Sequence, residues 1–230
     1  MKSKLGSFFS VLLAGTLFLF TSCESEESEN VNQDRIYALY ELFYDANRDV
    51  TFARTTFFFG NVTGTKLELS DGASITFDGQ ALAFNNTLAF YEREIAGFVD
   101  SGSFSYTDLD GNTFNNPASI NTVDFPDGQN TVVNKSQSYT IEWDGTALSN
   151  GESVTVSIVP NAVAESELFI QASTGATSII LTQNRLEDIQ SVVGELVMDR
   201  FTSSEPAEAT SAGGEVLGHY RASNLSVTIE

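Results

Sequence analysis

Tight-turn dipeptides are the sequence feature that most restricts how this chain can fold. Each pairs an Asp or Asn with a Gly, and these residue types accept the positive φ of a hairpin turn. Between the dipeptides run short stretches of alternating apolar and polar residues, the period of a strand with one buried face. Long helical periodicity is nearly absent, so the sequence predicts an all-β fold. Six of the dipeptides fall between residues 71 and 151: Asp71-Gly72, Asp78-Gly79, Asp110-Gly111, Asp127-Gly128, Asp144-Gly145 and Asn150-Gly151.

The first half of the chain opens with two apolar runs at residues 36–44 and 50–59, which flank a polar turn and predict an antiparallel hairpin. In the run Phe57-Phe58-Phe59, Phe58 must lie on the face opposite its neighbours, because strand side chains alternate. We expect one face of that strand to meet another domain, with a ligand as the alternative. Further candidate strands, which together suit a β-sandwich, lie at residues 66–69, 74–77, 81–84, 88–95, 103–107 and 113–114.

The loop-like stretch Asn115-Asn116-Pro117 predicts a domain boundary, after which the strand pattern restarts. Seven later candidate strands resemble the immunoglobulin-like sandwich, although the cysteine pair of that superfold is missing. The resemblance implies two tandem antiparallel β-sandwiches, a first domain at residues 34–116 and an immunoglobulin-like domain at 117–230. The seven candidates lie at residues 120–125, 138–143, 153–159, 168–171, 178–182, 195–201 and 216–229.

Two segments interrupt the strand pattern of the second half. Asn184, followed three residues later by Glu187, is typical of a helix-capping start and predicts a single short helix over residues 184–193. Residues 203–214 are rich in Ser, Glu, Ala and Gly and predict a mobile exposed loop. Loops of this length can carry function.

The first residues have the three zones of a secretion signal: basic Lys2 and Lys4, an apolar run at residues 8–20, and a small polar pair before Cys23. The apolar run is too short for a permanent membrane span, which takes about 20 residues. Cys23 is the only cysteine in the chain. An ectodomain exported without a second cysteine has no internal disulfide and must be held by packing.

Phe20-Thr21-Ser22-Cys23 resembles the relaxed lipobox of Bacteroidota surface lipoproteins, with Phe and Ser at positions where Leu and Ala or Gly are common. The acidic run at residues 24–29 resembles the tag that directs such lipoproteins to the cell surface. The resemblance implies that residues 1–22 are removed, Cys23 is acylated, and residues 23–33 form an acidic tether on the outer membrane. The alternative is that Cys23 is a plain residue after an ordinary signal peptide.

Charge narrows the range of partners. Without Lys2 and Lys4 the chain keeps 11 − 2 = 9 basic residues against 31 acidic ones, a formal charge of 9 − 31 = −22. Nucleic acid and anionic lipid are poor partners for such a field. Divalent cations, cationic proteins and neutral glycans remain open.

Little in the sequence points to catalysis. The only histidine is His219, on a predicted strand and without a G-x-S-x-G motif, and we expect it to be a packed or rim residue. Zinc and haem sites need clustered His or Cys ligands, which the chain lacks. Carboxylates are abundant, but no pair stands out, so we expect a protein that is not an enzyme and needs no cofactor.

Two weak ligand sites can be named. Asp108, Asp110 and Asn112 offer oxygen ligands at alternate positions, as calcium loops do, but the spacing fails the EF-hand pattern and a hairpin turn is the preferred interpretation. Trp143, with nearby tyrosines, could stack on a sugar ring, although such residues are also ordinary core fillers.

These observations favour a lipid-anchored envelope protein acting as a non-catalytic binding or adhesion module, with another envelope protein as partner. The alternative is a glycan-binding lipoprotein accessory to a polysaccharide uptake system. A sandwich fold does not decide between the two, since such folds carry unrelated functions.

Overall fold

The computed structural model describes residues 25–162 and 165–230 and is mainly β, with one short α-helix. The all-β class and the single short helix predicted from the sequence are therefore confirmed. No helix in the described part of the chain is long and apolar enough to cross a membrane. The predicted signal at residues 1–22 and Cys23 lie outside the described residues.

The strands of the first half include the long hairpin predicted from the sequence. They are β1 (Glu26–Glu27), β2 (Ile36–Asp45), β3 (Val50–Phe59), β4 (Lys66–Glu68), β5 (Ser74–Phe77), β6 (Gln80–Ala81), β7 (Ala83–Asn85), β8 (Phe90–Ala96), β9 (Ser101–Thr107) and β10 (Thr113–Ser119). Two 3₁₀ turns, Ser28–Asn30 and Gln33–Arg35, lie between β1 and β2.

The second half holds the remaining strands and the helix. They are β11 (Val132–Val133), β12 (Tyr139–Glu142), β13 (Glu152–Pro160), β14 (Glu167–Gln171), β15 (Ser178–Leu181), α1 (Gln183–Leu186), β16 (Val193–Ser204), β17 (Gly214–Arg221) and β18 (Leu225–Ile229).

One long sheet runs through the whole molecule in the order β1-β4-β3-β2-β17-β16-β13-β14. β2 and β3 pair antiparallel along their full length, which confirms the predicted hairpin. β17, from near the end of the chain, pairs parallel with β2 from Gly214 opposite Ala38 to Arg221 opposite Asp45. This pair joins the two halves of the chain.

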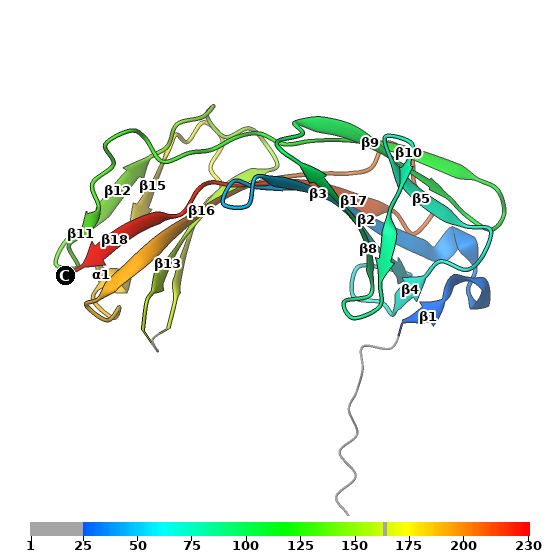
Figure 1. Cartoon of the computed structure of the whole chain (residues 1–230), viewed down its shortest axis with the longest axis horizontal. Coiled ribbons are helices and arrows are strands. Elements are labelled where there is room, and N and C mark those ends of the chain that lie inside the picture. The colour runs from blue at the N-terminus through cyan, green and yellow to red at the C-terminus, as the bar shows by residue number, and fades with distance from the viewer. Residues whose placement is uncertain (1–24, 163–164) are drawn as a thin grey trace, which may run out of the picture.

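Figure 1 shows the described chain as an arch, with the long sheet along its inner side. A four-stranded sheet, β10-β9-β5-β6, and a two-stranded sheet, β12-β15, cover the outer side at the two ends. One hydrophobic core fills the space between these layers in both halves. We call the uncovered side of the long sheet the inner face.

Alternation explains which residues face each way. In β2 the even-numbered residues from Ile36 to Tyr44 are buried toward the outer sheets, whereas Tyr37, Leu39 and Glu41 are half-buried on the inner face. β13 repeats the same period over nine residues. Burial of one side of each strand stabilises the sheet by about 25 cal/mol per Å² of apolar surface.

The predicted architecture of two tandem antiparallel sandwiches is too simple. The long sheet is mixed, with parallel pairs β17–β2, β1–β4 and β11–β18. Register between segments so far apart depends on contacts that no local pattern encodes. The division into domains at residues 34–116 and 117–230, and the immunoglobulin-like character of the second, stay predictions.

The predicted loop at residues 115–117 is wrong, because these residues lie inside β10. Pro117 is tolerated there because β10 is the edge strand of its sheet, where a missing N–H breaks no ladder bond. Asn116 is fully buried and donates from Nδ2 to the Glu208 carbonyl at 2.9 Å. Turn-forming residues alone therefore did not mark a loop.

Three further predictions need correction. Residues 120–125 form only an isolated bridge from Asp124 to Asp144. The strand predicted over 216–229 is divided into β17 and β18, because the chain breaks pairing around Ala222 and β18 moves to the other end of β16. The helix covers only Gln183–Leu186, and its N-cap is Thr182, without a side-chain cap bond.

The acidic tether predicted for residues 23–33 is wrong from Glu26 onward. β1 pairs with β4, and Ser28 is buried with its hydroxyl accepting from the Ser70 N–H at 2.9 Å. Gln33 donates from Nε2 to the Ser28 carbonyl at 2.7 Å. Polar side chains satisfy the backbone of this segment, so it folds although its composition is typical of a solvated linker.

Candidate functional site

A row of four stacked rings crosses the inner face where the two halves of the chain meet. Phe201 on β16, His219 on β17, Phe43 on β2 and Phe52 on β3 are direct partners in the register of adjacent strands. Ring centroids along the row are 4.3, 4.1 and 5.6 Å apart, and neighbouring rings are within 27° of parallel. We call these four residues the aromatic row.

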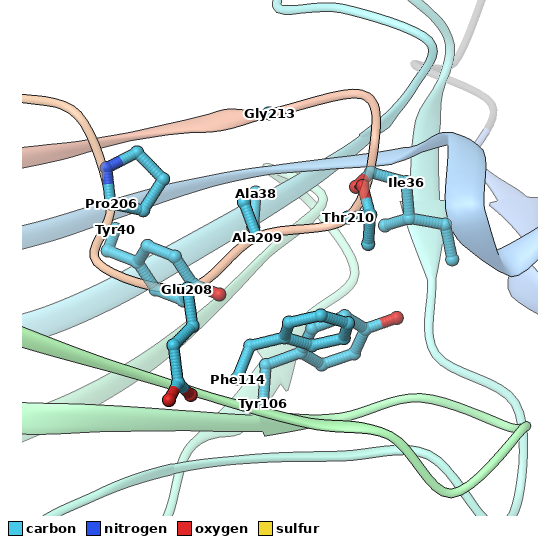
Figure 2. A pocket seen from close by; sticks show the side chains of 10 residues that line it. All are labelled: Ile36, Ala38, Tyr40, Tyr106, Phe114, Pro206, Glu208, Ala209, Thr210 and Gly213. Atoms are coloured by element: carbon cyan, nitrogen blue, oxygen red, sulfur yellow. The ribbon is translucent and has the colours of Figure 1, made fainter.

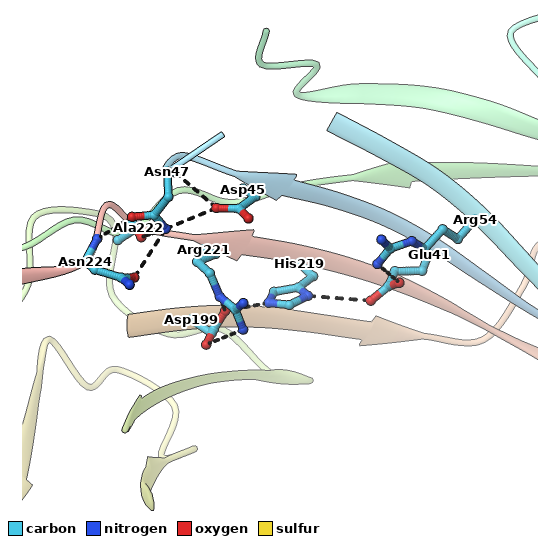
Figure 3. Close-up of polar contacts among 9 residues, drawn as sticks. All are labelled: Glu41, Asp45, Asn47, Arg54, Asp199, His219, Arg221, Ala222 and Asn224. Atoms are coloured by element: carbon cyan, nitrogen blue, oxygen red, sulfur yellow. Dashed lines mark hydrogen bonds and ion pairs between the residues drawn. The ribbon is translucent and has the colours of Figure 1, made fainter. Parts of the chain in front are cut away.

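His219 has a carboxylate at each ring nitrogen, as Figure 3 shows. Nε2 lies 2.7 Å from Asp199 Oδ1, and Nδ1 lies 3.5 Å from Glu41 Oε1. The ring is also covered on both faces by Phe43 and Phe201. The imidazole is therefore buried, although the side chain lies on the uncovered side of the sheet.

Strand geometry explains why these partners meet. Asp199 stands two residues before Phe201, and Glu41 stands two residues before Phe43. Side chains two residues apart share a face, so each carboxylate lies diagonally beside the histidine on a neighbouring strand. The sequence placed His219 on a strand, but it did not indicate the acidic partners of the ring.

Two arginines extend the charged network. Arg221 donates from Nε to Asp199 Oδ1 at 2.8 Å, and Arg54 donates from Nε to Glu92 Oε2 at 2.5 Å. The Arg54 guanidinium also lies 4.4 Å from the centroid of Phe52, so it covers one end of the aromatic row. Cations and carboxylates alternate around the row, which balances their charges locally.

The network shifts the pKa of its three central groups. Burial by itself would lower the pKa of His219, but the hydrogen bonds and charges of Asp199 and Glu41 raise it above the usual value. Burial opposes ionisation of Glu41 and Asp199, yet His219 and the arginines hold the pKa of both carboxyls below their usual range. The arrangement therefore favours a histidinium between two carboxylates.

This geometry suits a structural role, in which His219 links neighbouring strands, rather than proton transfer to a substrate. A general base needs a nitrogen within reach of the reacting group, whereas both nitrogens of His219 face carboxylates. The expectation of a packed histidine agrees with its burial.

Around the aromatic row the inner face carries half-buried apolar side chains, which alternate with the fully buried ones along each strand. The Arg54 guanidinium carbon lies 5.7 Å from the centroid of the Phe90 ring, at one margin of the row. These half-buried residues are Tyr37, Leu39, Phe90, Val159, Val197, Phe201 and Leu217.

The turn between β2 and β3 is tied to the end of β17 beside this face. Asn47 donates from Nδ2 to the Ala222 carbonyl at 3.3 Å and accepts from the Asn224 N–H at 2.8 Å (Figure 3). These bonds link the start and the end of the chain a second time, close to the aromatic row.

Trp143, predicted as a stacking platform, is 5% exposed and belongs to the core. Its indole Nε1 donates to the Thr146 carbonyl at 3.4 Å. Tyr40, Tyr44 and Tyr91 are buried as well. This burial agrees with the alternative of an ordinary core filler and not with a ring that is presented to a ligand.

Asp108 and Asn112 close the hairpin between β9 and β10. Asp108 Oδ1 accepts from the Asn112 N–H at 2.8 Å, and Oδ2 accepts from Asn112 Nδ2 at 3.0 Å. The preferred interpretation as a turn agrees with these bonds, while calcium binding by Asp108, Asp110 and Asn112 stays a prediction. Within residues 25–162 and 165–230, no group of three or more His, Cys, Asp or Glu side chains is placed to hold a metal ion.

The segment at residues 205–213 is bonded to the first half of the molecule. The Thr210 hydroxyl donates to the Ile36 carbonyl at 2.7 Å, and Glu208 accepts from the Asn115 N–H at 2.5 Å. Figure 2 shows the segment over Tyr40 and Tyr106, around a cavity of about 10 Å³. That volume matches a single water molecule. The prediction of a free, mobile loop is corrected by these contacts.

The fold and the site define a mainly β arch, joined through a buried charged and aromatic row. No protein-family model matches this chain, and no curated protein matches it either.

Proposed function

We propose that this chain is a lipid-anchored protein of the bacterial cell envelope, acylated at Cys23, that binds a partner protein through the inner face of its arch. The lipobox-like residues before Cys23 and the acidic residues after it support the location. Two or three acyl chains give stable anchoring, whereas one chain holds a protein only marginally.

The inner face is the observation that carries the binding part of the proposal. It combines half-buried aromatic and aliphatic side chains with Arg54 and Arg221 around the aromatic row. Protein interfaces are enriched in Tyr, Phe and Arg, and their centres are apolar with a polar rim. The acidic surface elsewhere favours solubility over contact.

The role is non-catalytic in this proposal, because the only histidine holds two strands together and neither ring nitrogen is free. The glycan-binding alternative named Trp143 as the centre of its stacking platform, and Trp143 is buried in the core. We therefore commit to a protein partner in the same envelope.

Affinity capture with variant proteins tests the proposal. Tagged protein is cross-linked in intact cells of its native host and recovered, using the natural sequence, Leu217→Asp on the inner face, and Ile180→Asp on the outer side. Leu217 is half-buried and Ile180 is 54% exposed, so neither change empties the core. We expect one partner with the natural chain and with Ile180→Asp, and its loss with Leu217→Asp. Equal recovery from all three proteins would exclude the inner face as the binding surface.

A further inference from the structure

The distance between the proposed anchor and the folded body is very short. β1 begins at Glu26, three residues after Cys23. Three residues span at most about 11 Å even when fully extended. If Cys23 carries lipid, as the proposed function holds, the part of the arch beside β1 is held within that distance of the bilayer. Figure 1 places β1 and β4 at one foot of the arch.

Two loops at this foot, residues 60–65 and 85–89, contain no acidic residue. Each loop presents one aliphatic side chain, Val62 at 46% exposure and Leu88 at 52%. Lys66 Nζ donates to the Leu88 carbonyl at 2.7 Å, which holds the two loops side by side.

An exposed aromatic ring and a second cation complete this surface. Phe59, at the end of β3, is 40% exposed, and the Arg35 guanidinium lies 5.9 Å from its centroid. Gly60 donates its N–H to the Arg35 carbonyl at 2.7 Å, so the ring and the cation are held together. Aromatic rings and long cationic side chains are the groups that settle at a membrane interface.

We propose that this foot, formed by Phe59, Val62 and Leu88 with Arg35 and Lys66, rests in the interfacial layer of the bilayer that holds the acyl anchor. Glu26, Glu27 and Glu68 lie beside it on β1 and β4 and disfavour anionic lipid. The lipid it fits is therefore a zwitterionic phospholipid. The acyl chains supply the affinity, and the foot fixes the orientation of the arch on the membrane.

Nitroxide depth measurements test the inference on lipidated protein in phosphatidylcholine vesicles. Acylation consumes the thiol of Cys23, the only cysteine, so a cysteine introduced by Val62→Cys, Leu88→Cys or Ile180→Cys is the single labelling site. Ile180, on β15 in the other half, is the exposed control. Collision of each label with oxygen, which enters lipid, is compared with collision with a water-soluble nickel complex.

The inference predicts an oxygen-to-nickel ratio several-fold higher at positions 62 and 88 than at 180. Equal ratios at all three positions, in protein that floats with the vesicles, would contradict docking of the foot on the membrane but not lipid anchoring at Cys23. Protein with its natural Cys23 that stays out of the floating fraction would overturn both the foot and the proposed function. Melting curves of the labelled variants confirm that each one is folded.

Discussion

The imidazole of His219 stacks on the ring of Phe43 with centroids 4.1 Å apart, across the parallel pair formed by β17 and β2. This contact joins the last third of the chain to its first long strand. The carboxylates of Asp199 on β16 and Glu41 on β2 hold the two ring nitrogens of the histidine. The stability of the arch should therefore depend on the charge of one side chain.

The free energy of unfolding should therefore depend on pH, and the direction follows from the pKa of His219. The pKa of His219 is raised in the folded state, so its stabilisation is fully present below the unfolded value near 6.5 and is lost as the pH rises through the folded pKa. We expect the free energy of unfolding to be larger at pH 6 than at pH 9. In His219→Gln, which cannot carry the charge, this difference should shrink. Urea unfolding at the two pH values measures it, and an unchanged difference in the variant would exclude His219 as its source.

The same network acts in the opposite direction in acid. Glu41 and Asp199 have lowered pKa values, so their stabilisation is present above the unfolded values near 4 and is lost as the pH falls through the folded ones. We expect Asp199→Asn to cost about 3 kcal/mol at pH 6, the order found when one partner of a buried pair is removed. The cost should diminish toward pH 3. A cost that does not change with pH would show that the charge of Asp199 is unimportant.

Gly218, beside His219, should tolerate no side chain. A Cβ at this position would lie 2.0 Å from the backbone oxygen of Ser119, where β17 passes the end of β10. We expect Gly218→Ala to lower the free energy of unfolding by at least about 3 kcal/mol, the upper range for overpacking. Gly213→Ala is the control, because it meets no atom within 4 Å and costs only the strain of its positive φ, about 1–2 kcal/mol. Equal losses in the two variants would contradict the close approach.

Arg200 and Glu152 form a buried ion pair on the core side of the second half, with Nη2 2.8 Å from Oε2. Arg200 also donates to the carbonyls of Thr122 and Thr146, so the pair anchors two loops. We expect Arg200→Met to cost about 3–5 kcal/mol, because it leaves a buried carboxylate unpaired. The double variant Arg200→Met with Glu152→Leu should recover part of that loss. Additive losses in a double-mutant cycle would contradict the pairing.

Trp143 supplies an optical test of the core, since it is the only tryptophan. Its burial predicts a blue-shifted emission maximum and weak quenching by iodide. Polysaccharides should leave the emission unchanged. Strong iodide quenching, or a saturable shift with a glycan, would restore Trp143 as a surface residue.

Local patterns predicted the elements whose pairing is also local. The hairpin of β2 and β3 and the strand β13 follow from alternation over nine or ten residues, because side-chain period and burial are set within one strand. Strands and turns were missed where turn-forming or polar residues suggested loops or linkers. Examples are Pro117 on an edge strand and Ser28, whose side chain is buried.

The candidate site could not be predicted because its parts come from distant segments. Nothing in the residues around His219 indicates that Asp199 and Glu41 will lie beside it, since their contact depends on the parallel register of β17 with β2. For Trp143 the sequence left a stacking platform and a core filler both open, and the core of the second half encloses it. Lipidation of Cys23 depends on a short motif outside the described residues and stays a prediction.

Mass spectrometry of the protein from membranes of its native host shows whether the chain is anchored through Cys23. We expect a mature chain that begins at Cys23, with a diacylglyceryl group on the cysteine sulfur and no peptide from residues 1–22. Protein that retains Lys2 and Lys4, or that carries an unmodified Cys23 thiol, would contradict both the envelope anchor and the membrane-docked foot.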